Sequence, residues 1–66
     1  MSRYTVWSVG RDGNMLEHLS FDVPREAIEF QEALRFVSPR LVFGITDNEN
    51  PEAGDVSDRL AEEVSK

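Results

Sequence analysis

The 66-residue chain carries 13 acidic and 7 basic residues, a formal net charge of −6, and contains no cysteine. A chain of this length forms one domain with a thin core, because it buries only about 60% of the surface that it exposes when unfolded. Disulfides are excluded, and a single histidine without any thiolate excludes a zinc site of four nitrogen and sulfur ligands. Association is the remaining way to bury more surface, so we expect a homo-oligomer or an obligate protein partner.

The location of the protein is predicted from what the sequence lacks. No apolar stretch approaches the roughly 20 residues that span a bilayer. The first residues lead directly into a strand pattern instead of a signal peptide. The absence of cysteine agrees with a reducing compartment. We therefore expect a cytoplasmic protein that does not contact a membrane.

The negative charge is concentrated near the C-terminus. Residues 1–46 hold six acids and five arginines, a net charge of −1, whereas residues 47–66 hold seven acids against Arg59 and Lys66, a net charge of −5. Such a field repels nucleic-acid phosphates and favours either solubility or a basic protein partner. Direct binding of DNA or RNA is therefore not expected.

Two strands joined by a tight turn are predicted first. β-Branched and aromatic residues mark a strand over 4–9, alternation marks another over 15–21, and Asp12-Gly13 between them is typical of a two-residue hairpin turn. Counting outward from that turn predicts the following cross-strand pairs: Val9 with Leu16, Trp7 with His18, Thr5 with Ser20 and Arg3 with Asp22 on one face, and Val6 with Leu19 and Tyr4 with Phe21 on the other. A longer loop over 10–14 is the alternative, and it would shift this register.

A helix is predicted over 24–37, with Asp22 as its cap and Pro24 in its first turn. It should end before Ser38-Pro39, because a residue that precedes proline disfavours the helical conformation. Helical periodicity places Ala27, Phe30, Ala33, Leu34 and Val37 on the face toward the sheet and leaves two apolar residues, Ile28 and Phe36, exposed.

A third strand over 41–46 completes the predicted fold. A right-handed crossover places it beside the first strand and antiparallel to it. The fold class is therefore α+β, a ββαβ core over 1–46 with a three-stranded, mainly antiparallel sheet and one packed helix. The acidic segment 47–66 follows, and it forms either a short helix from about residue 56, capped by Asp55, or a disordered tail.

Two constellations suggest chemistry, and each has a simpler interpretation. His18, Ser20 and Asp22 share one face of a strand, but side chains two residues apart lie nearly 7 Å from each other, too far for a nucleophile and its base. An acidic run near the C-terminus resembles a calcium-binding loop; its members are Asp47, Glu49, Glu52, Asp55 and Asp58. It lacks the glycine at the sixth position and the glutamate at the last position that such loops need. We expect no catalytic residues, no metal and no cofactor.

Two surfaces are the predicted partner-binding sites. If the helix covers one face of the sheet, Trp7, Val9, Leu16 and His18 remain on the other, where the C-terminal segment, a second copy or a foreign protein would cover them. The second surface is acidic and is formed by Glu26, Glu29 and Glu32 with the C-terminal segment. It is either a solvated face or a mimic of the phosphate backbone. The exposed Phe36 is a further predicted contact.

These features predict a non-enzymatic protein-interaction module that acts as a small acidic inhibitor by blocking the basic, nucleic-acid-binding surface of a partner. In size and charge the chain is similar in general character to the inhibitors that bacteriophages encode against host machinery. The alternative is a self-assembling structural or accessory protein, such as a homodimer, with no inhibitory role.

Overall fold

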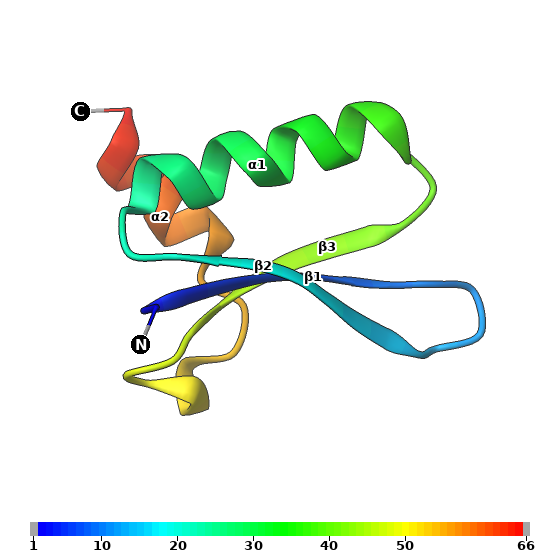
Figure 1. Ribbon diagram of the computed structural model, residues 1–66, viewed down its shortest axis with the longest axis horizontal. Helices are drawn as coiled ribbons and strands as arrows, with labels where there is room; N and C mark the ends of the chain where they lie inside the picture. Colours follow the sequence, from blue (N-terminus) through cyan, green and yellow to red (C-terminus); the bar gives the residue numbers. More distant parts are fainter. Residues whose placement is uncertain (1, 66) are drawn as a thin grey trace.

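The computed structural model describes residues 2–65, which form a three-stranded sheet with two helices on one side (Figure 1). The strand order is β2-β1-β3, and the central strand is antiparallel to both neighbours. The predicted α+β class, the ββαβ order and the place of the third strand beside the first are confirmed. In chain order the elements are β1 (Tyr4–Val9), β2 (Met15–Phe21), α1 (Pro24–Val37), β3 (Val42–Asp47), the 3₁₀ turn η1 (Pro51–Ala53) and α2 (Ser57–Val64).

The β1–β2 hairpin has the longer of the two predicted loops, yet it keeps the predicted register at the far end of the strands. Near the turn, Val9 pairs with Met15, so the connection is the longer loop over 10–14, in which Gly13 has a φ of 81°. Farther along, a β-bulge in β2 restores the predicted pairing of Val6 with Leu19 and of Tyr4 with Phe21. A bulge inserts one extra residue into one strand and so changes which side chains share a face.

The bulge overturns two predicted pairs. Trp7 lies opposite Glu17 rather than His18, and Val9 lies opposite Met15 rather than Leu16. The prediction was wrong because a residue count from the turn assumes an uninterrupted ladder, and the sequence carries no local mark of the extra residue.

Helix α1 has the predicted bounds but a different cap residue. Its first residue is Pro24, and Val23 occupies the cap position without a side-chain hydrogen bond. The prediction that Asp22 caps the helix was wrong: its Oδ1 accepts a hydrogen bond from the backbone N–H of Arg3 at 3.2 Å. Asp22 therefore ties the ends of β1 and β2 together.

The buried side of α1 is rotated from the predicted one. Ile28, expected on the surface, is only 6% exposed, whereas Val37, expected to face the sheet, is 76% exposed. Ala33 is also exposed. The reason is α2, which packs along the Ile28 side of α1 and supplies the buried Leu60.

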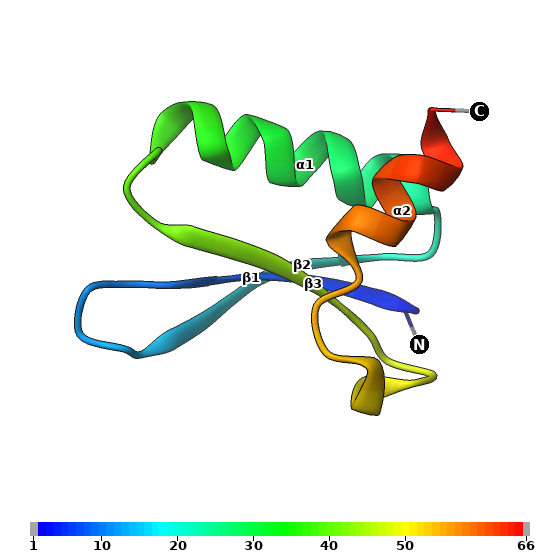
Figure 2. The same ribbon diagram turned by 180° about the vertical axis from the view of Figure 1, so that it is seen from behind.

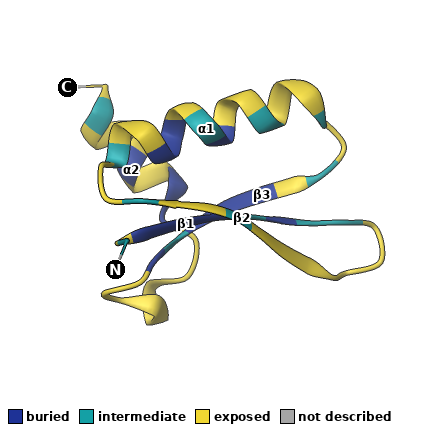
Figure 3. Cartoon of the chain, viewed as in Figure 1, coloured by how far each residue is buried: buried dark blue, intermediate teal, exposed yellow. Residues whose placement is uncertain are grey.

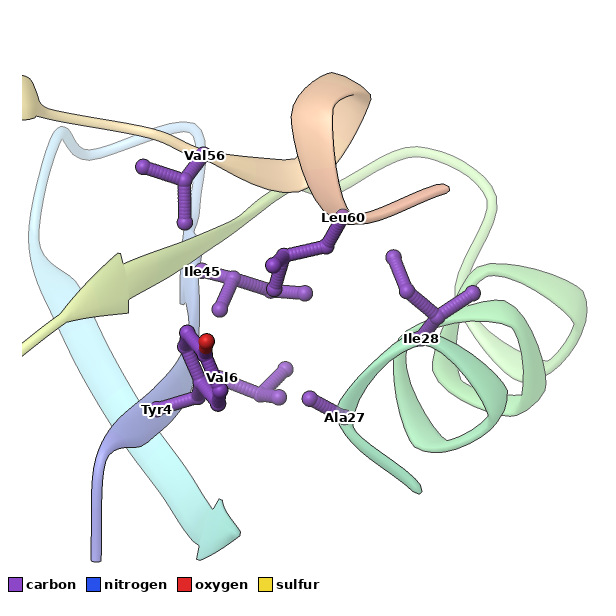
Figure 4. Packing of buried hydrophobic residues seen from close by; sticks show 7 residues of the cluster. All are labelled: Tyr4, Val6, Ala27, Ile28, Ile45, Val56 and Leu60. Carbon is purple, nitrogen blue, oxygen red and sulfur yellow. The ribbon is translucent and has the colours of Figure 1, made fainter. Parts of the chain in front are cut away.

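The core lies between the sheet and the two helices (Figure 4). Val6, Ile45 and Leu60 are fully buried and come from β1, β3 and α2. Segment 47–65 thus completes the core rather than forming a disordered tail. The start of α2 is held to β3 by Asp55, whose Oδ1 accepts hydrogen bonds from the backbone N–H groups of Ile45 at 2.9 Å and Ser57 at 3.0 Å.

Exposure is uneven along the chain. Residues around the hairpin turn, most of β2 and the last turn of α1 are exposed, whereas β1 and the middle of β3 are buried (Figure 3). Within residues 2–65, neither helix has the length and apolar character that a membrane span requires.

Candidate functional site

Trp7 is fixed on the sheet face that points away from the helices. Its indole ring lies across Gly44, where an added Cβ would come within 2.2 Å of the ring. The indole Nε1 donates a hydrogen bond to Thr46 Oγ1 at 2.9 Å. The half-buried Val9 and the exposed Met15 and Val42 extend this open face towards the hairpin turn. An ordered aromatic ring beside exposed apolar side chains is typical of a contact surface.

The C-terminal helix does not cover the open face. Figure 2 shows α2 on the same side of the sheet as α1, with only the turn and η1 on the other side. Asn48, in that turn, donates from Nδ2 to Thr5 Oγ1 at 2.8 Å, so it covers one end of the face. The sequence left three candidates to cover this face: the C-terminal segment, a second copy or a foreign protein. For the part around Trp7, the second copy and the foreign protein remain.

The other two residues predicted for this surface lie on the helix side. His18 Nε2 is 2.8 Å from the hydroxyl of Ser8, and its ring is 6.5 Å from the rings of both Phe30 and Phe43. Leu16 pairs with Ser8 and therefore shares that side. The structure thus groups Trp7 with Val9 but separates them from Leu16 and His18.

The residues of the suspected triad each have a different partner. His18 contacts Ser8, the hydroxyl of Ser20 lies 2.9 Å from that of Thr5, and Asp22 accepts from Arg3. The Ser8–His18 pair has hydrogen-bond geometry, but Ser8 is 3% exposed and the described surface contains no pocket that leads to it. This pair fits a satisfied polar contact in the core.

The acidic side chains of α1 share their face with an aromatic residue. Glu26, Glu29 and Glu32 are exposed along the helix. Phe36 follows Glu32 by four residues and Glu29 by seven, which places all three on one side of a helix. The Phe36 side chain is 90% exposed. We call Glu29, Glu32 and Phe36 the acidic-aromatic face.

The acids of the C-terminal segment divide into structural and exposed groups. Asp47 is 1% exposed and binds two arginines that are distant in the sequence: Arg3 Nε lies 3.3 Å from Oδ1, and Arg59 Nη2 lies 3.4 Å from Oδ2. The acidic run around Asp47 predicts a solvated turn, and the sequence does not reveal this cluster because neither arginine is near Asp47 in the chain. Among residues 2–65 no group of three or more His, Cys, Asp or Glu side chains could hold a metal ion.

We expect the Asp47 cluster to make stability depend on pH in acid. The Arg3 hydrogen bond, against the opposing effect of burial, holds the pKa of Asp47 below its ordinary value. The folded state therefore binds a proton less readily than the unfolded state. The stabilisation is complete above the ordinary aspartate pKa, about 3.9, and is lost as pH falls below it. Urea unfolding at several acidic pH values should show this loss.

Asp47→Asn should reduce the slope of stability against pH in that range and lower stability at neutral pH, because both arginines lose a charged partner. Asp12→Asn is the control. Hydrogen bonds from Asn14 lower the pKa of Asp12 too, but in the exposed hairpin turn, so this variant should remove only its own part of the slope. An unchanged slope in Asp47→Asn would contradict the assignment.

The class of protein is thus a small α+β domain with a β2-β1-β3 antiparallel sheet, two helices on one face and an open face that carries Trp7. A scan against models of known protein families, a search of curated proteins and a search of solved structures each found no match.

Proposed function

We propose that this protein is a non-catalytic interaction module that binds a basic surface of another protein through the acidic-aromatic face of α1. The observation that carries the proposal is the place of Phe36, a 90% exposed aromatic side chain on the same side of the helix as Glu29 and Glu32. An exposed aromatic residue has a solvation cost that burial in a partner removes, and aromatic anchors carry much of the energy of protein interfaces.

The charge of this face favours a basic partner. Carboxylates on a rigid helix attract lysine and arginine side chains and resemble the spaced charges of a nucleic-acid backbone. We infer that the partner is a basic, nucleic-acid-binding protein and that occupation of its groove inhibits it. The proposal includes a cytoplasmic location, where such partners occur.

The experiment uses the purified chain, immobilised, to capture proteins from a cell extract at low and high salt. The double variant Glu29→Lys/Glu32→Lys should lose the captured protein. The control is Glu49→Lys/Glu52→Lys, which changes the net charge equally but lies at the turn and η1, on the opposite side of the sheet. Binding that falls with salt and survives the control change identifies a specific charged face.

Phe36→Ala should weaken binding of the captured protein about tenfold or more, because it removes the apolar anchor without changing charge. The captured protein should also lose its affinity for duplex DNA or RNA when the wild-type chain is added. Capture that responds equally to both charge reversals, or a captured protein that binds nucleic acid normally in the presence of the chain, would contradict the proposal.

A further inference from the structure

Most of the exposed apolar residues outside the acidic-aromatic face lie on one side of the molecule, along β2 and the side of α1 above it. Phe30 on α1 contacts Phe21 and His18 of β2, with ring centroids 5.4 and 6.5 Å apart. This contact shows which side of α1 faces β2. Ala33 and Val37 follow Phe30 by three and seven residues and so continue the same side of the helix. Both are exposed.

Strand β2 adds further apolar residues beneath this side of the helix. Leu16 and Leu19 pair with Ser8 and Val6 of β1, whose side chains face the helices, so they share that side of the sheet. Leu16 is 61% exposed and Leu19 is 53% exposed. The exposed Val23 lies in the connection between β2 and α1. We call the surface formed by these residues the β2 flank: Leu16, Leu19, Val23, Ala33 and Val37.

The outer edge of β2 is open for strand pairing. Within the described residues β2 pairs only with β1, and its sequence from Met15 to Phe21 contains no proline, glycine or lysine. Those residues, with bulges and charges, are the usual protection of an edge strand. Here the protection is limited to Glu17 and the bulge at His18. The open edge thus presents backbone N–H and C=O groups beside exposed leucines.

The other edge of the sheet is already occupied. Ile45 of β3 donates its N–H to the Asp55 carboxylate and accepts from the backbone N–H of Val56, both at 2.9 Å. Asp55 also forms a β-bridge with Thr46. A second copy therefore cannot pair its β2 with the middle of β3. Pairing of β2 with β2 about a two-fold axis remains, and it closes after two copies.

We propose that the β2 flank is the dimer interface of this protein, in which β2 pairs antiparallel with β2 of a second copy to form a six-stranded sheet. A lone foreign strand would satisfy the edge but leave Ala33 and Val37 of the helix layer uncovered. A second copy supplies both layers, because a two-fold axis normal to the sheet places α1 beside α1 above the paired strands.

The backbone geometry provides a sharp test at Ser20. The N–H and C=O of Ile45 point away from β1, so those of Val6, opposite it, point toward β2. Leu19 and Phe21 pair with alternate residues of β1 and use their backbone groups there, which leaves the N–H of Ser20, between them, pointing outward. Ser20→Pro should remove one intermolecular hydrogen bond while the internal ladder stays intact. Ser20→Ala is the matched control, because it loses only the hydroxyl contact with Thr5.

A second pair of variants does not depend on a proline. Val37→Glu introduces a charge on the exposed helix part of the β2 flank. Val42→Glu introduces the same charge at a 64% exposed position on the opposite edge strand. Val37→Glu should raise the dimer dissociation constant about tenfold or more, because it places a carboxylate in an apolar contact twice per dimer. Val42→Glu should leave the dissociation constant unchanged.

Light scattering at micromolar to millimolar concentration gives the mass, and circular dichroism checks the fold of each variant. The expected result is a wild-type mass that reaches twice the 7.5 kDa of the chain, with the same concentration dependence in Ser20→Ala and Val42→Glu. In Ser20→Pro and Val37→Glu the monomer mass should persist to higher concentration, about tenfold or more for Val37→Glu. A wild-type monomer at every concentration would overturn the proposal. So would a dimer that resists both flank variants, a dimer that only Val42→Glu dissociates, or an open series of larger assemblies. Binding to a basic partner is tested separately and does not affect this outcome.

Discussion

Leu60→Ala is expected to lower the free energy of unfolding by about 2 to 5 kcal/mol, the cost of deleting a buried leucine side chain and leaving a cavity. Leu60 is fully buried and packs with Ile28 of α1 and Ile45 of β3 in the core cluster. A domain of this size has a total stability of only about 3 to 10 kcal/mol. The substitution should therefore leave the chain marginal or unfolded at room temperature.

Urea unfolding followed by circular dichroism measures this loss. Glu62→Ala is the matched control, because it truncates an exposed side chain on the same helix and should change stability by no more than about 0.5 kcal/mol. A Leu60→Ala variant as stable as this control would show that α2 contributes little to the core, and the role assigned to segment 47–65 would be wrong.

Gly44→Ala is expected to displace the Trp7 indole from the sheet. The added Cβ would lie 2.2 Å from a ring carbon, so the ring must move, and its hydrogen bond to Thr46 breaks. Overpacking of this kind costs about 1 to 3 kcal/mol. Because the chain has a single tryptophan, its fluorescence should shift to longer wavelength as the indole enters water.

A double-mutant cycle separates this clash from other effects of the new methyl group. In a Trp7→Ala background the space above Gly44 is empty, so Gly44→Ala should be neutral or stabilising, since alanine fits a strand at least as well as glycine. An equal loss of stability in both backgrounds would show that the backbone at Gly44, rather than the indole, requires glycine.

Elements whose signals lie within a few neighbouring residues are predictable from the sequence. Pro24 and the Ser38-Pro39 step bound α1 because each acts on the backbone of its immediate neighbours. Alternating apolar residues mark the strands, and the order of strands and helix restricts the topology. The exposure of Phe36 and of the α1 glutamates also follows from helical periodicity alone.

Features that depend on residues far apart in the chain become visible only in the assembled fold. The bulge at His18 moves Leu16 and His18 to the helix side, although local propensity would accept either register. The docking of α2 buries Ile28 against Leu60 and leaves Val37 exposed. The periodicity of one helix cannot reveal which flank a second helix will cover.

The pairing of charged residues also depends on contacts between distant parts of the chain. Asp47 stands in an acidic run that predicts a solvated turn, yet Arg3 and Arg59 converge on it from both ends of the chain. Asp55 and Val56 occupy the edge of β3, whereas β2 is paired only with β1 within the described residues, so its outer edge is open. Local signals predict where β1, β2, α1 and β3 form, but they leave open whether the segment of α2 is helical. The contacts between elements determined which surfaces stay exposed, because burial is a property of the assembled fold and not of any one segment.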